Sequence, residues 1–166
     1  MSTRAQIGFY ERESGLESRP IALIYQHSDG YPSSREAGVV RTLIDIFPPL
    51  IEQRGSYDPS YLAAQTLYRL IDRYDKGESG LGFGLDNELH GDTRFYYAVV
   101  SQGVYVFDAR DLIDRQLDDL SEVKPMFFTS WRHDEERRNI EQQIEELQAR
   151  LNNLNLAKQS IACRQP

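Results

Sequence analysis

The sequence predicts an α+β fold: an antiparallel sheet with two helices on one face, followed by a long C-terminal coiled-coil-like helix. Short apolar segments with period two, or with several β-branched and aromatic residues together, are typical of strands. Two segments between them, residues 39–47 and 63–74, repeat their apolar residues at helical spacing. From residue 130 onward a single narrow apolar stripe continues to the end of the chain.

The first two strands are expected to form a hairpin. Ala5, Ile7 and Phe9 alternate with other residues, and residues 21–25 form a short apolar run. Residues 29–32, Asp-Gly-Tyr-Pro, follow as a strong turn signal, because Asp and Gly tolerate turn angles and Pro fixes φ.

Two helices are expected next. Ser33 and Glu36 have the spacing of a capping box, and Pro48-Pro49 should end the first helix because proline lacks the backbone N–H. Asp58-Pro59 provides an N-cap and a first-turn proline for the second helix, which residues 76–77 should end.

Two further strands complete the predicted order ββ-αα-β(β)β. Residues 95–100 and 104–107 are strongly β-forming, and Gln102-Gly103 between them has the length of a hairpin turn. Residues 126–128 either add an edge strand or dock the C-terminal tail.

The charge divides the chain into an acidic head, residues 1–129, and a neutral helical tail, residues 130–166. The tail carries six basic and six acidic residues, so the whole net charge of −7 belongs to the head. The tail's apolar residues follow a 4-3 spacing that favours a coiled-coil homodimer, although the helix could instead fold back on its own head. The expected dimer seam is Ile140, Ile144, Leu147, Leu151, Leu154 and Ile161.

Composition excludes several classes of function. The 19 Lys and Arg against 26 Asp and Glu argue against direct binding to nucleic acid. We expect no membrane association, because no run approaches ~18 apolar residues and no apolar signal segment is present. The single cysteine, Cys163, has no partner for an internal disulfide, which favours a reducing cytoplasm.

Two short motifs are the candidate binding residues. His27 and Asp29, like His90 and Asp92, form a His-x-Asp pattern near a strand end, where folds display functional groups. If both motifs meet, they could contact a ligand, hold a divalent metal or act in acid–base chemistry. Each aspartate is also explained as a turn former, and we predict neither catalytic residues, nor a metal, nor a cofactor.

An acidic cluster follows the last predicted hairpin. Such a cluster is ordinarily a solvated face, and the sharper interpretation is a contact surface for a basic groove on a partner. Its candidate residues are Asp108, Asp111, Asp114, Asp118 and Asp119.

The order of three segments resembles a family of small proteins from phages and bacterial mobile elements. The segments are Ser-Thr-Arg-Ala at residues 2–5, His-Ser-Asp-Gly-Tyr-Pro at residues 27–32 and His-Gly-Asp at residues 90–92. The resemblance covers residues 2–108 and leaves out the tail. That family has no established activity, so the resemblance implies a setting: a phage accessory protein, such as an anti-CRISPR or other anti-immune inhibitor, in the cytosol of the host cell.

The leading hypothesis is therefore a non-enzymatic binding protein that binds a host immune effector protein or sequesters a nucleotide-type signal. Its contact residues would be Arg4, which suits phosphate, together with both motifs and Tyr31 of the turn. One alternative is a metal-dependent hydrolase or phosphoesterase that uses the two His-x-Asp motifs. Another is a scaffolding protein acting through its tail.

Overall fold

The computed structural model describes residues 3–13, 15–32, 38–74, 82–115, 117–131, 143–148 and 150–151. The chain divides into two units, Met1–Trp131 and Arg132–Pro166. The first unit contains the sheet and its helices, and all the sites considered below lie in it. Among the described residues, no helix has both the length and the apolarity needed to cross a membrane.

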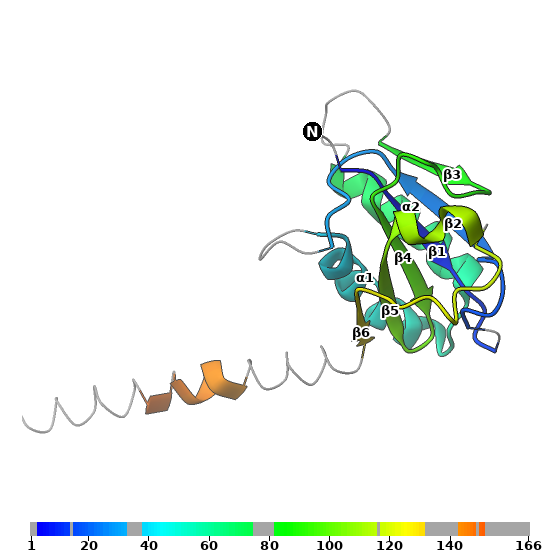
Figure 1. Ribbon diagram of the computed structural model, residues 1–166. Helices are drawn as coiled ribbons and strands as arrows, with labels where there is room; N and C mark the ends of the chain where they lie inside the picture. Colours follow the sequence, from blue (N-terminus) through cyan, green and yellow to red (C-terminus); the bar gives the residue numbers. More distant parts are fainter. Residues whose placement is uncertain are drawn as a thin grey trace, which may run out of the picture. The chain divides into compact units, whose positions relative to one another are not determined.

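Six strands form one sheet in the order β3-β2-β1-β4-β5-β6 (Figure 1). The strands are β1 (Ala5–Phe9), β2 (Ala22–Gln26), β3 (Phe83–Asp86), β4 (Phe95–Val100), β5 (Gly103–Asp108) and β6 (Phe127–Ser130). The two predicted hairpins, β1–β2 and β4–β5, are confirmed as antiparallel pairs. Residues 127–130 form an edge strand on β5, which decides between the two alternatives for this segment.

The prediction of an antiparallel sheet is wrong, because the sheet is mixed. β1 and β4 are parallel neighbours, with Ala5 opposite Phe95 and Phe9 opposite Val99. β3 pairs with β2 and runs in the same direction as β1, so the chain must cross back over two strands before it enters β4. Strands that run in the same direction need a crossover connection. Residues 87–94 make this crossover between β3 and β4.

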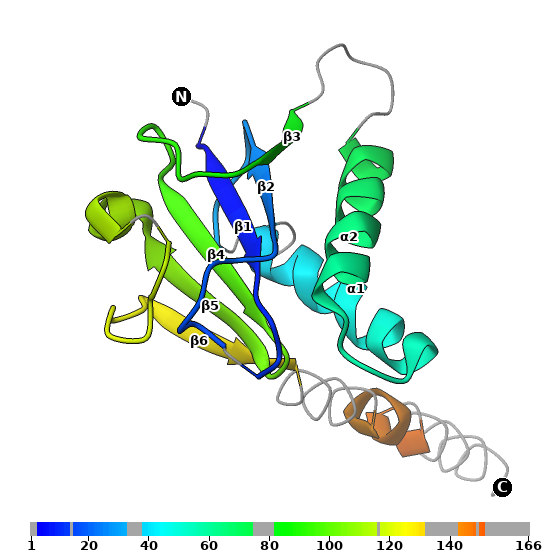
Figure 2. The same cartoon turned by 90° about the vertical axis from the view of Figure 1, so that its right-hand side faces the viewer.

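Helices α1 (Val39–Arg54) and α2 (Pro59–Tyr74) cover one face of the sheet, as predicted (Figure 2). The Asp58 cap is confirmed, since its carboxylate accepts the Tyr61 N–H at 3.0 Å. Pro48-Pro49 does not end α1, which continues to Arg54 and keeps Leu50 buried. Burial of this apolar stripe offsets the two missing backbone hydrogen bonds. The predicted capping box lies outside the described residues.

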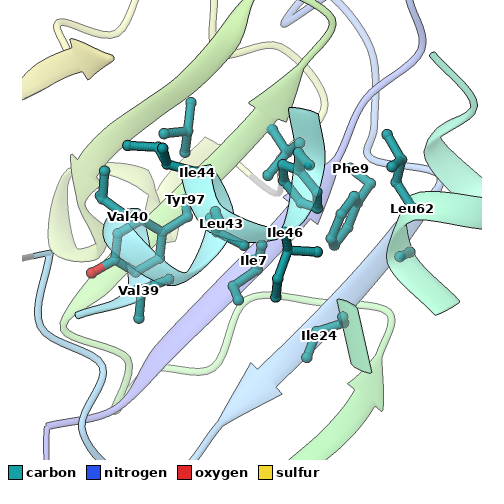
Figure 3. Close-up of a cluster of buried hydrophobic side chains, with 14 of the residues drawn as sticks. Ile7, Phe9, Ile24, Val39, Val40, Leu43, Ile44, Ile46, Leu62 and Tyr97 are labelled. Atoms are coloured by element: carbon teal, nitrogen blue, oxygen red, sulfur yellow. The ribbon is translucent and has the colours of Figure 1, made fainter. Parts of the chain in front are cut away.

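The core between the helices and the sheet is apolar on both sides. Ile7 and Phe9 of β1 point toward Leu43 and Ile46 of α1 and Leu62 of α2 (Figure 3). The Phe9 and Phe47 rings meet edge to face at 5.9 Å. This packing makes the helical face a closed structural layer.

The opposite face, here called the non-helical face, is divided. Over β4 and β5 it carries a second apolar cluster that includes Tyr96 and Phe107, covered by Leu112 and Leu120. Leu112 belongs to the 3-10 helix η1 (Ala109–Arg115), which lies on the side of the sheet away from α1 and α2 (Figure 2). Over β1, β2 and β3 the same face carries the polar side chains of Gln6, Tyr25 and Asp86 beside Leu23, which belongs to the second cluster. The candidate site lies among these polar side chains, and this part of the face is called the polar half.

The prediction of a long C-terminal coiled-coil helix is also wrong. Beyond Trp131, the structure describes helical residues only at 143–148 and 150–151. The seam residues there are well exposed: Ile144 at 48%, Leu147 at 62% and Leu151 at 58%. These described residues gain little from packing, and most helical stability in proteins comes from tertiary contacts. The remaining seam residues, Ile140, Leu154 and Ile161, lie outside the described residues.

Candidate functional site

The site is built by the crossover loop, defined here as residues 87–94. This loop connects the end of β3 to the start of β4 and passes over the polar half of the non-helical face. The register explains its course, because Asp86 lies opposite Leu23 on one side and Phe95 lies opposite Ala5 on the other. The loop therefore returns along the strands to the end of the sheet where β1 and β4 begin.

Gln6 fixes the crossover loop to the sheet. This side chain is fully buried, and its amide nitrogen donates to the Glu88 carbonyl at 2.9 Å and to Asp86 Oδ2 at 3.3 Å. Its amide oxygen accepts the His90 N–H at 2.9 Å and the Thr93 hydroxyl at 3.0 Å. A buried amide with both ends satisfied holds the loop in one position, because each lost bond would leave a polar group desolvated.

The loop places His90 on the ring of Tyr25. The two ring centroids lie 4.8 Å apart, and the His90 Nε2 faces the Asp86 carboxylate. On the other side, the Tyr25 hydroxyl lies 3.4 Å from the His27 Nδ1. One tyrosine thus brings together the imidazoles of both His-x-Asp motifs. We call Arg4, Tyr25, His27, Asp86, His90 and Asp92 the sheet-end cluster.

Arg4 and Asp92 complete the cluster. The Arg4 Nη1 donates to Asp92 Oδ2 at 2.5 Å, whereas its Nε is buried and has no hydrogen-bond partner in the described part of the chain. These charges reach Tyr25: burial raises the pKa of its hydroxyl, Asp92 and Asp86 raise it further, and Arg4 lowers it. Arg4, Asp86 and Asp92 therefore all act on the Tyr25 hydroxyl.

The turn after β2 is held against the sheet but lies outside the cluster. Gly30 donates its N–H to the Thr3 carbonyl at 2.9 Å, and a Cβ at this position would lie 2.6 Å from that of Ala5. Asp29 adopts a left-handed φ of 57°, as a turn former does. Neither Asp29 nor Tyr31 makes a hydrogen bond, ion pair or ring contact with the cluster in the described residues. The structure thus brings together four of the six predicted contact residues.

The two motifs do not combine into one ligand set for a metal. Asp92 faces Arg4, and His90 faces Asp86 rather than its motif partner. Across the described ranges, no three His, Cys, Asp or Glu side chains are arranged to hold a metal ion.

Most of the predicted acidic surface has partners of its own. Asp108 pairs with Arg110 at 2.6 Å and with Arg94 at 3.4 Å, and its hydrogen bonds to Arg110 lower the pKa of the carboxyl to about 2. Asp118 pairs with Arg19. Asp119 accepts the Ser121 N–H and hydroxyl. Of the others, Asp111 is exposed, and the side chain of Asp114 is outside the described part of the chain.

Sequence reasoning missed three members of the site: Gln6, Tyr25 and Asp86. Gln6 sits at a polar position of an alternating strand, which predicts an exposed side chain, but the crossover loop buries it. The register of the first predicted hairpin could have indicated Gln6 and Tyr25, because the two residues lie opposite each other on β1 and β2.

Comparisons with protein-family models, with curated proteins and with solved structures found no match for this chain.

Proposed function

We propose that this protein is a non-enzymatic binding protein that holds a small anionic ligand of the nucleotide type at the sheet-end cluster. The observation that carries the proposal is the Arg4 side chain, which stays 35% exposed while its Nη1 donates to Asp92 and its Nε has no partner in the described part of the chain. A guanidinium presents its N–H groups as a planar fork that suits phosphate oxygens.

His90 adds a second donor position. Its Nε2 is occupied by Asp86, and its Nδ1 has no hydrogen-bond partner among the described residues. When the ring is protonated, Nδ1 donates to an anion. Because Gln6 and Tyr25 already fix this ring, the ligand does not need to order it, and preorganisation of this kind favours affinity.

The acidic surface is the weaker candidate for the contact. Arg94, Arg110 and Arg19 neutralise two of its carboxylates from within the same chain. A basic groove on a partner would therefore find the Asp108 and Asp118 carboxylates already paired.

The biological setting rests on the sequence resemblance alone. Within that setting, the proposed role is counter-defence for a phage or mobile element in the host cytosol, by sequestering a nucleotide signal of the immune response. Binding of an immune effector protein at the same cluster is the alternative within the same class of function.

The test is isothermal titration of the full chain with a nucleoside triphosphate, a cyclic dinucleotide and inorganic phosphate. We expect saturable binding of at least one nucleotide, weakened at least tenfold by Arg4→Lys, which keeps the charge but loses the fork. Arg110→Lys is the matched control, because Arg110 is also paired with an aspartate but lies outside the cluster. Equal losses in both variants, or no binding of any phosphate compound, would contradict the proposal.

A further inference from the structure

A pocket opens on the non-helical face, at the opposite end of β4 and β5 from the sheet-end cluster. It has a volume of about 430 Å³, within the range of small-ligand sites. Val100 and Tyr105 come from the β4–β5 hairpin, Leu16 from the β1–β2 connection and Val123 from the segment before β6. Three separate parts of the chain therefore converge on it.

The lining of this pocket is mixed: apolar side chains form part of its wall, and polar and charged groups form the larger part of its exposed surface. Val100 is buried, and Leu16, Tyr105 and Val123 are half-buried. The Tyr105 ring is held by Phe128 of β6, with 4.4 Å between ring centroids. Such a mixed lining suits a group with an apolar stem and a polar or charged end.

The exposed part of the lining is charged. Glu13 and Glu17 border the pocket together with Arg12. Within the described residues, neither glutamate makes a hydrogen bond or an ion pair, in contrast to Asp108 and Asp118, which have arginine partners. Two carboxylates against one guanidinium give this border a net negative charge.

We propose that this pocket receives the side chain of an arginine or lysine from a partner protein. Both side chains combine an apolar stem with a charged head, and they bury the stem along apolar surface while the head stays near water. The stem would lie against Leu16, Val100 and Val123, and the head between Glu13 and Glu17. This site is separate from the sheet-end cluster and does not depend on the function proposed for it.

The test uses three small probes on the full chain: N-acetyl-arginine methylamide, its uncharged citrulline analogue, and N-acetyl-glutamate methylamide. Binding is followed by the NMR shifts of the Leu16, Val100 and Val123 methyl groups. We expect saturable shifts with the arginine probe and affinity at least tenfold weaker for the other two. Glutamate binding as well as arginine, or methyl groups that do not shift, would overturn the proposal.

Variants that change the charge of the pocket border test whether its negative charge attracts the arginine probe. The double variant Glu13→Gln and Glu17→Gln should weaken the arginine probe about tenfold, whereas Arg12→Gln should strengthen it about threefold by removing repulsion. All three residues are exposed, so these variants should fold. Affinity changes of the opposite sign in these variants would overturn the proposal. Methyl shifts that depend on protein concentration alone would also overturn it, because a second copy of the chain would then be the occupant.

Discussion

The two halves of the non-helical face are closed in different ways. Over β4 and β5, Phe107 and Tyr96 are buried under Leu112 and Leu120, so apolar area closes the face. Over β1 to β3, a single buried glutamine closes it through four hydrogen bonds to residues 86–93. Apolar burial is non-directional, whereas hydrogen bonds fix direction, so the Gln6 bonds hold the loop that carries His90 and Asp92 in a defined position.

The largest expected effect belongs to the apolar half. Phe107→Ala removes a fully buried ring and should lower the free energy of unfolding by about 3–5 kcal/mol. Chemical denaturation measures this directly. A loss below about 1 kcal/mol would show that burial does not hold this half together.

The polar half should respond to the loss of hydrogen bonds at nearly constant side-chain volume. Gln6→Met leaves the His90 N–H, the Thr93 hydroxyl and the Glu88 carbonyl without their partner, which should cost about 2–3 kcal/mol. It should also weaken ligand binding, because His90 is no longer fixed. Gln53→Met, on an exposed glutamine of α1, is the matched control and should change neither quantity. Equal stability of the two variants would contradict the role given to Gln6.

A side-chain hydrogen bond also lies inside the apolar half, so its contribution can be compared with that of apolar burial in the same half. The Tyr10 and Tyr96 hydroxyls lie 2.8 Å apart in a buried position. Tyr10→Phe leaves the Tyr96 hydroxyl without this partner and should cost about 1–2 kcal/mol, less than the loss of Phe107. The urea midpoints of the Tyr10→Phe and Phe107→Ala proteins measure the two losses. Equal losses would show that hydrogen bonding contributes as much as apolar burial to the stability of this half.

The smallest effect is pH-dependent and belongs to the border of the two halves. The pKa of Asp108 is lowered to about 2, chiefly by hydrogen bonds from Arg110. A lowered pKa in the folded state means that the stabilisation is present above the ordinary carboxyl range and is lost as pH falls toward 2. Asp108→Asn should therefore cost less than about 1 kcal/mol at pH 7, and most of this cost should have disappeared by pH 2. Thermal unfolding between these values would show a constant difference if the ion pair were irrelevant.

The parts of the fold that local patterns encode could be predicted. Alternation in residues 5–9 and the Asp58 cap identified a hairpin and a helix start, and both are present. The parallel pairing of β1 with β4 depends on how residues 87–94 cross the sheet, which no local pattern encodes.

The site was predicted only in part, because it also depends on how residues 87–94 cross the sheet. His27, His90, Arg4 and Asp92 were found as motifs, but Gln6 appears exposed in an alternating strand until the crossover loop covers it. The tail shows the reverse case, because a 4-3 apolar stripe is a local pattern, whereas a coiled coil requires a packed partner face that Leu147 and Leu151 do not have in the described residues.

We propose that the polar half of the non-helical face holds an anionic ligand and leaves it unchanged. The most direct measurement is an NMR titration of the labelled full chain with the nucleotide that binds, followed by chromatography of the recovered ligand. We expect saturable amide shifts in residues 88–93 and around Arg4, none in η1, and an intact ligand. Conversion of the ligand that stops in His27→Ala or His90→Ala, while the protein stays folded, would contradict it.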